Sequence, residues 1–530
     1  MFAFPARRSA LLSRNSLQRW LPPLFSGVLL ALAFPCHPQN PFAFLFNPAW
    51  AYIALVPLLA SLQGGSFKEG FRRAWAAGLA FNLMGLYWVA YTQGGGLAVV
   101  AGTALMALYL GLFNGLFGGA LNILAARLGP VALAAAPFLW TAAEYLLSLG
   151  ELGFPWLLLG HSQAAFPSLI QYASITGVYG VSFWLVVGNS LLASLLNSRP
   201  ARAVALATGA ALTLLLPWLH GRSLLAQTQT SAATMRVALI QPNLAFAEKW
   251  GPEGLDRSIE LLAKLSFSAA RQQPDLVVWP ETALPCYLQT QANCRQPISA
   301  LVDSMDVQLL TGASDYDYDR RQPYNAAFLV NPQGQSIQSY AKMHLVPFGE
   351  RTPYRDSIPL LRAIDWSRLT GALGPTEFAP GREQTLFAHP AGDFAVLICF
   401  ESVFPDLVRR SVSQGARLLV NITNDSWFGR TAGPYQHAQL AVFRAVENRR
   451  PVARCATSGI SLFIDTFGRP RQATDIFTQA VRVDDLTLAS ETTFYTRHGD
   501  LFAQLALGVS CSLLLCALLP AQWIKTSYVR

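Results

Sequence analysis

Long runs of apolar residues dominate the first part of the chain, and one more lies near its end. A helix needs about 20 mainly apolar residues to cross the roughly 30 Å hydrocarbon core of a bilayer. Most of these runs contain no Asp, Glu, Lys or Arg. The pattern predicts a polytopic α-helical membrane protein with eight spans, at residues 20–38, 48–66, 74–93, 97–126, 131–150, 169–197, 203–220 and 501–523.

Basic residues lie on one side of these spans only. Cytoplasmic loops retain an excess of Lys and Arg, which sets the orientation of the spans. The loops at 39–47, 94–96 and 151–168, on the opposite side, contain neither residue. The basic residues that flank the spans on the cytoplasmic side are Arg7, Arg8, Arg14, Arg19, Lys68, Arg72, Arg73, Arg127, Arg199, Arg202, Lys525 and Arg530. We therefore expect both termini to be cytoplasmic and the long segment before the last span to face outward.

From about Thr234 the pattern changes to short apolar runs separated by polar helical stretches and turns. Several runs are continuously apolar, as in strands that are covered on both faces. This segment is expected to be a globular α/β domain. The predicted organisation is seven spans in 1–221, an outward-facing domain in 222–498, and the eighth span with a cytoplasmic tail in 499–530. Strands are expected to begin near Met235, Asp275, Val307, Asn325, Phe394, Ala416 and Ile460, and helices near Pro252 and Tyr435.

The composition agrees with a membrane protein that has a separate polar part. Hydrophobic residues make up 52% of the 530 residues and charged residues only 13%, which is too apolar for an ordinary soluble enzyme. The net charge of +9 does not indicate nucleic-acid binding, because the basic residues flank apolar segments instead of forming one patch. The histidines lack metal-ligand spacing, so no metal site is expected.

Three short stretches place reactive side chains at the ends of expected strands. VVWPETALP contains Glu281, YAKMHLVPFGE contains Lys342 and Glu350, and VLICFESVFP contains Cys399 and Glu401. A thiol nucleophile needs a base, and its tetrahedral intermediate needs donors and a nearby cation. A single cysteine after an apolar strand is also a common packing residue. The residues by themselves therefore leave both interpretations of Cys399 open.

In this order and spacing, the three stretches resemble the nitrilase or carbon–nitrogen hydrolase superfamily. The stretch NITNDSWFG from Asn421 and the helix from His437 resemble it too. Together with the spans and the loop from Gly153, the chain resembles the membrane-embedded apolipoprotein N-acyltransferase family. The resemblance implies a nitrilase-like αββα sandwich for the outer domain.

The resemblance also implies roles for the reactive residues. Cys399 corresponds to the nucleophile, Glu281 to the general base and Lys342 to the support of the oxyanion. Glu350 and Glu401 correspond to further site carboxylates, whose alternative role is to orient Lys342.

Four aromatic residues complete the expected site. Phe400 departs from the tyrosine of some family members, which leaves only its backbone N–H as a donor to the oxyanion. Trp250 matches a tryptophan that family members place near the acyl chain. Together with Trp427 and Phe428, it is expected to line a lateral opening between the outer domain and the spans.

The function implied by the resemblance is a transfer between two lipids. An acyl chain passes from a phospholipid to Cys399 as a thioester, and then to the α-amine of the N-terminal diacylglyceryl cysteine of an apolipoprotein. The reaction needs no cofactor, and its expected place is the bacterial inner membrane with the domain in the periplasm. Two alternatives remain open: a membrane-tethered amidase or thioesterase that uses water, and a non-catalytic receptor or transporter.

Two further features of the sequence bear on the outer compartment. Cys286 and Cys294 lie eight residues apart in one segment, and an oxidising compartment would allow them to form a disulfide. Glu144 lies near the outer end of the fifth predicted span. An acid at that depth is either functional or interfacial, and the sequence does not distinguish these two roles.

Overall fold

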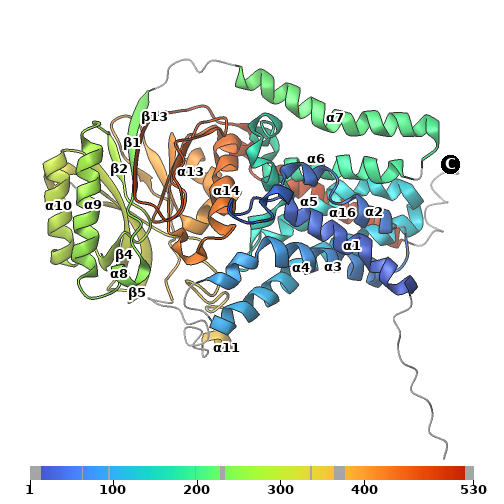
Figure 1. Ribbon diagram of the computed structural model, residues 1–530, viewed down its shortest axis with the longest axis horizontal. Coiled ribbons are helices and arrows are strands. Elements are labelled where there is room, and N and C mark those ends of the chain that lie inside the picture. Colours follow the sequence, from blue (N-terminus) through green and yellow to red (C-terminus); the bar gives the residue numbers. More distant parts are fainter. Residues whose placement is uncertain are drawn as a thin grey trace, which may run out of the picture.

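In the computed structural model, two sheets and their helices form one end of the molecule and a bundle of long helices forms the other (Figure 1). The structure describes residues 14–62, 64–92, 96–196, 198–226, 233–334, 337–362 and 377–519. Among the predicted cytoplasmic flanks, Arg7, Arg8, Lys525 and Arg530 lie outside these ranges.

The bundle contains helices within the expected ranges, but the structure does not confirm all eight of them as membrane spans. Four apolar stretches in the described ranges are long enough to cross a membrane: Gly96–Leu147, Ala173–Leu195, Pro200–Leu225 and Leu501–Leu518. They agree with a membrane protein. The main helices are α1 (Arg14–Leu32), α3 (Phe67–Gly85), α4 (Gly96–Leu128), α5 (Ala136–Leu147), α6 (Ala173–Leu195), α7 (Pro200–Leu225) and α16 (Leu501–Leu518).

The expected continuous helix over 48–66 is wrong. The chain forms a 3-10 turn at Pro48–Tyr52 and a short helix α2 at Val56–Ser61. Between them the N–H of Leu55 donates to the buried side chain of Asn189 in α6, at 2.8 Å. Irregular backbone is tolerated inside an apolar bundle where such polar side chains satisfy it. The break therefore depends on a residue far away in the sequence.

Helix α3 begins earlier than the apolar pattern predicts. The Ser66 side chain accepts a hydrogen bond from the Glu69 N–H at 3.3 Å and so caps the helix before its charged first turns. Lys68, Arg72 and Arg73 consequently lie in α3 and not in a loop between two spans.

The other end of the molecule consists of two packed sheets. In the first, the strand order is β13-β1-β2-β4-β5-β6, with β3 beside β4, and in the second it is β12-β11-β10-β9-β8-β7. The first sheet contains β1 (Thr234–Gln241), β2 (Leu276–Val278), β3 (Leu284–Tyr287), β4 (Gln308–Asp317), β5 (Gln322–Val330), β6 (Gln338–Ala341) and β13 (Ala480–Thr487). The second contains β7 (Leu386–Phe387), β8 (Phe394–Ile398), β9 (Leu418–Thr423), β10 (Val452–Ala456), β11 (Leu462–Ile464) and β12 (Pro470–Arg471).

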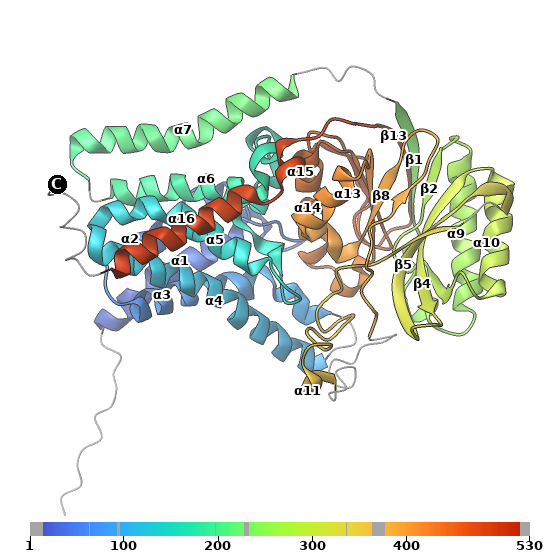
Figure 2. The ribbon, with the colours of Figure 1, turned by 180° about the vertical axis from the view of Figure 1, so that it is seen from behind.

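The two sheets form the inner layers of an αββα sandwich (Figure 2). Buried side chains such as Val237 and Val278 of the first sheet share one core with Val396 and Val420 of the second. The outer face of the first sheet is covered by α9 and α10, and that of the second by α13 and α14. The expected architecture of this domain is confirmed. The covering helices are α9 (Gly254–Ala270), α10 (Ala292–Met305), α13 (Pro405–Ser413) and α14 (Gly433–Asn448).

Helix α14 lies between the second sheet and the helical bundle. The Gln436 side chain accepts hydrogen bonds from the indoles of Trp88 and Trp156, at 2.9 and 3.0 Å, and donates one to the Gly85 carbonyl at 3.0 Å. All these groups are buried, so their hydrogen bonds hold the domain in a defined position against the bundle.

Strand β13 was missed in the sequence because it is an edge strand with polar residues. It pairs antiparallel with β1, from Thr234 opposite Thr487 to Gln241 opposite Ala480. The sequence left open whether Cys286 and Cys294 form a disulfide, and in the structure they are bonded to each other.

Candidate active site

The backbone turns sharply at Cys399, where β8 ends and a 3-10 turn, η9 (Cys399–Val403), begins. Cys399 has a φ of 52°, in the left-handed region that non-glycine residues seldom occupy. Such strain persists where the surrounding structure imposes it, often at functional sites. The strand that the sequence predicts from Phe394 therefore ends at Ile398, before Cys399 and Glu401, and the turn gives Cys399 a conformation unlike that of a packing residue inside a strand.

Glu281, Lys342 and Glu350 come together in one buried cluster with Asn325. The Lys342 ammonium lies 3.1 Å from Glu281 Oε1 and 2.9 Å from Glu350 Oε1. The Asn325 side chain donates to the same two oxygens at 2.8 and 2.9 Å. One cation and one amide thus bind both carboxylates. Buried charges need such paired and hydrogen-bonded partners to offset the cost of leaving water.

The second oxygens of both carboxylates are also bonded. Glu281 Oε2 accepts from the Asn424 N–H at 2.9 Å, and Glu350 Oε2 accepts from the Val346 N–H at 2.8 Å. Asn325 and Asn424 were missed as site residues. Asn424 lies in the stretch NITNDSWFG, which resembles the superfamily, but that stretch did not single it out. Asn325 has only its place in an apolar strand, which is too common to indicate a site.

The charges of the cluster determine the state of the thiol. Burial raises the pKa of Cys399, the Glu281 carboxylate raises it further, and Lys342 opposes them only in part. Burial disfavours the Lys342 ammonium, but Glu281 and Glu350 outweigh burial and raise its pKa. At neutral pH the site therefore contains a neutral thiol beside a charged ammonium, so nucleophilic attack requires a base.

Glu401 connects the turn after β6 to the turn at Cys399. Its Oε1 accepts from the Tyr340 hydroxyl and the Met343 N–H, both at 2.7 Å, and its Oε2 accepts from the Ile398 N–H at 2.8 Å. Burial raises the pKa of Glu401 to about 7, against the lowering effect of these hydrogen bonds. Both oxygens of Glu401 accept hydrogen bonds from backbone N–H groups and from Tyr340. The geometry therefore favours a role in which Glu401 orients the two turns over one in which it contacts a substrate.

Replacing Glu401 by glutamine is expected to lower the free energy of unfolding by about 1–3 kcal/mol, because the new amide must point its N–H groups at another donor. Thermal unfolding of the purified protein measures the change. The exposed Glu383 provides a control, and Glu383→Gln should leave the midpoint unchanged. An unaltered midpoint in Glu401→Gln would contradict the orienting role.

An aromatic cluster lies next to the loop that contains Glu281. The Phe246 ring is 4.9 Å from that of Trp427 and 6.1 Å from that of Trp250, which is 39% exposed. Between these residues the buried Lys249 donates to the Thr282 carbonyl at 2.9 Å. Burial lowers the pKa of Lys249 to about 8. Lys249 was missed in the sequence, where it is simply a charge before a tryptophan.

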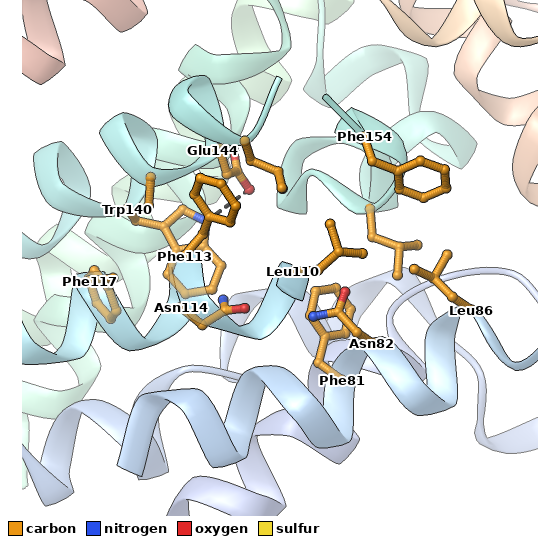
Figure 3. Close-up of a pocket in the computed structure, with 13 residues that line it drawn as sticks. Phe81, Asn82, Leu86, Leu110, Phe113, Asn114, Phe117, Trp140, Glu144 and Phe154 are labelled. Carbon is orange, nitrogen blue, oxygen red and sulfur yellow. Dashed lines mark hydrogen bonds between the residues drawn. The ribbon is translucent and has the colours of Figure 1, made fainter. Parts of the chain in front are cut away.

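A mainly apolar crevice lies between α3, α4, α5 and the loop after α5 (Figure 3). One of the residues that line it, Phe154, has its ring centroid 5.6 Å from that of Phe400, next to Cys399. Phe154 thus links the wall of the crevice to the residue that follows Cys399. Trp250, Trp427 and Phe428 do not belong to the wall of this crevice, and their place at a lateral opening between the domain and the spans stays a prediction.

Glu144 lies at the crevice with its carboxylate tied to the protein (Figure 3). Its Oε1 accepts from the Trp140 indole at 2.9 Å and from the Leu159 N–H at 2.7 Å. These bonds to Oε1 hold the loop after α5 against that helix, which supports a structural role for Glu144.

The two-sheet sandwich and the buried Glu, Lys and Cys place this domain in the carbon–nitrogen hydrolase class, and residues 236–494 match the family model "Carbon-nitrogen hydrolase". Residues 26–191 match the "Apolipoprotein N-acyltransferase N-terminal domain" model. The chain belongs to the apolipoprotein N-acyltransferase family, which confirms the resemblance seen in the sequence.

Relatives of this name cover nearly the whole chain. The apolipoprotein N-acyltransferase of Chlorobaculum tepidum is 35% identical over 96% of this chain and 98% of its own. That of Geobacter metallireducens is 36% identical over 91% of this chain and 92% of its own. Among solved structures, Saccharomyces cerevisiae Nit3, a member of branch 10 of the nitrilase superfamily, covers 49% of this chain and 93% of its own, with 20% identity and a TM-score of 0.38.

Proposed function

We propose that this protein transfers an acyl chain from a phospholipid to the N-terminal diacylglyceryl cysteine of an apolipoprotein, through a thioester on Cys399. The observation that carries the proposal is the buried Glu281–Lys342 pair, whose two charges act on the buried thiol of Cys399. Relatives named apolipoprotein N-acyltransferase support the choice of acceptor.

In the first half-reaction Glu281 accepts the proton of the Cys399 thiol, and the sulfur attacks the ester carbonyl of the phospholipid. The carbonyl oxygen becomes an oxyanion that Lys342 and the Phe400 N–H stabilise. When the intermediate collapses, the ester C–O bond breaks, and Glu281 returns the proton to the departing lysophospholipid oxygen. The acyl chain remains on Cys399 as a thioester.

The position of Phe400 supports its part in this step. It is the second residue of η9, and the first N–H groups of a helix have no acceptor within the helix. An N–H in such a position is available to an oxyanion.

In the second half-reaction the α-amine of the apolipoprotein cysteine attacks the thioester carbonyl. Glu281 accepts the amine proton, the C–S bond breaks, and the thiolate regains a proton from Glu281. The product is an amide, which is more stable than the thioester. No step requires an energy-rich cofactor.

The proposal includes a membrane setting in which both lipids reach the site from the bilayer. Each CH₂ drawn out of an apolar environment into water costs about 0.8 kcal/mol, so a long chain must stay shielded throughout the transfer. We place eight spans in the inner membrane, with both termini in the cytoplasm and the domain between the last two spans in the periplasm. Trp250 and Trp427 then lie at the mouth of the site, where they contact acyl chains.

The test is to incubate the purified protein with a phospholipid and to map its peptides by mass spectrometry. An acyl adduct on Cys399 that hydroxylamine removes is expected. The buried Cys455 is an internal control in the same domain and should remain unmodified. A Cys399 thiol that persistently stays free would refute the mechanism.

The same preparation separates the two alternatives. An amidase or thioesterase would release free fatty acid without an acceptor amine. The transferase is expected to retain its adduct until a diacylated lipopeptide is added, which then gains the acyl chain. A non-catalytic receptor would bind lipid without forming any adduct.

A further inference from the structure

Behind Cys399 lies a buried histidine to which the mechanism above assigns no part. His437 belongs to α14, and its Nε2 is 3.2 Å from the Cys399 carbonyl oxygen and 3.2 Å from Ser402 Oγ. The Ser402 hydroxyl itself donates to the Cys399 carbonyl at 3.0 Å. The three groups therefore form a closed triangle around the backbone oxygen of the nucleophile.

The opposite side of the imidazole is bonded to a carboxylate. His437 Nδ1 lies 2.8 Å from Asp425 Oδ1, and Arg454 donates to Asp425 Oδ2 at 2.8 Å. Burial disfavours the charged form of Asp425, but Arg454 and His437 outweigh burial and lower its pKa to about 2. Asp425 is therefore ionised, and Nδ1 must carry the hydrogen that joins it to His437. This leaves Nε2 directed at Ser402 and Cys399.

Packing prevents the ring from turning away. The Trp156 indole lies against the His437 ring with 5.0 Å between the ring centroids, and the side chain of His437 is fully buried. Burial and the charge of Arg454 lower the pKa of His437, while the Asp425 carboxylate opposes them and favours the imidazolium. In the neutral ring Nε2 carries no hydrogen, and the single hydrogen of the triangle is that of the Ser402 hydroxyl, which either Nε2 or the Cys399 oxygen accepts. In the imidazolium Nε2 donates to the Cys399 oxygen, and the Ser402 hydroxyl donates to the same oxygen.

We propose that His437 is a positioning residue that, together with Ser402, fixes the direction of the Cys399 carbonyl and so aims the Phe400 N–H at the reacting acyl group. The physical reason is that Cys399 C=O and Phe400 N–H belong to one planar trans peptide and point in opposite directions. Holding the oxygen from behind sets where the N–H points in front. The inference rests on the proposed acyl transfer, in which that N–H stabilises the oxyanion.

Two substitutions of His437 separate this role from simple packing. In His437→Gln the amide reaches the position of Nε2 and can keep the triangle, although it loses Asp425. In His437→Asn the amide reaches only the position of Nδ1, so the contact with Asp425 remains and the triangle is lost. Ser402→Ala removes the hydroxyl with a smaller change of volume and provides a third, independent variant.

The experiment uses the full chain in detergent and compares two rates at Cys399: single-turnover acylation by phospholipid, and alkylation by iodoacetamide. Alkylation forms no oxyanion, so it does not depend on the Phe400 N–H. We expect His437→Asn to slow acylation by about 10²-fold, the effect of a lost oxyanion donor, and Ser402→Ala to act in the same direction. His437→Gln should stay within about tenfold of the unaltered protein, and alkylation should change by less than about threefold in all variants.

Equal losses in His437→Asn and His437→Gln, or alkylation that falls in parallel with acylation, would overturn the inference and leave His437 a packing residue. Thermal unfolding and a check that the Cys286–Cys294 bond is intact show whether each variant folds. If the His437 variants do not fold, the rates of Ser402→Ala test the inference. If the unaltered chain forms no thioester at all, the proposed function fails, and the two failures are thus distinguished.

Discussion

Replacing Cys399 by alanine is expected to abolish acyl transfer, with a loss on the order of 10⁶-fold, because no other group can form the thioester. The substitution removes only a sulfur atom from a largely buried position and should cost about 1 kcal/mol of stability. Loss of activity would thus not reflect unfolding. The measurements are the acyl adduct by mass spectrometry and the transfer of the acyl chain to a diacylated lipopeptide.

Cys455→Ala is the matched control. This cysteine is also buried in the domain, and its thiol lies 3.2 Å from the carbonyl oxygens of Ile240 and Val278, between two strands of the first sheet. Its loss should lower stability by a similar amount and leave the adduct on Cys399 unchanged. An adduct that persists in Cys399→Ala, or disappears in Cys455→Ala, would show that the nucleophile has been assigned wrongly.

Replacing Glu281 by glutamine is expected to slow acylation by about 10²- to 10⁴-fold, the usual contribution of a general base. The pKa of the Cys399 thiol is raised in this site, so the sulfur does not ionise without a proton acceptor. The amide of glutamine cannot accept that proton. One of its N–H groups must also face either the Asn424 N–H or the donors of Asn325 and Lys342, at a cost of about 1–3 kcal/mol.

The single-turnover rate of adduct formation measures this effect. Glu248→Gln removes the same charge from an exposed position one residue before Lys249 and should retain the rate within about twofold. If the Glu281→Gln protein keeps more than a tenth of the rate, another group must act as the base.

Much of the candidate site could be predicted because its residues follow apolar strands in a specific order. Glu281 comes just after β2, Lys342 directly after β6, and Cys399 directly after β8. Hydrophobic runs locate such strands, and the order of the motifs relates them to a family. The left-handed turn at Cys399 was not predicted, since a strongly apolar strand pattern continued through it.

The residues that hold the site together were not predicted. Asn325, Asn424, Lys249 and His437 are buried, but their side chains carry no pattern that distinguishes a hydrogen-bonding partner from a solvated polar residue. Each owes its place to a contact with a group from another strand or loop. The break in the second predicted span has the same cause, since Asn189 bonds the backbone there.

The sequence by itself determined which segments are buried away from water and which reactive side chains lie at the ends of those segments. Hydrophobicity is a property of each residue and its near neighbours, so the helical segments, the α/β domain and the order of Glu281, Lys342 and Cys399 follow from local patterns. The sandwich was implied by the family resemblance. Only the tertiary structure decided which polar groups meet. A hydrogen bond depends on distances of about 3 Å between groups that are far apart along the chain, and no local pattern contains those distances.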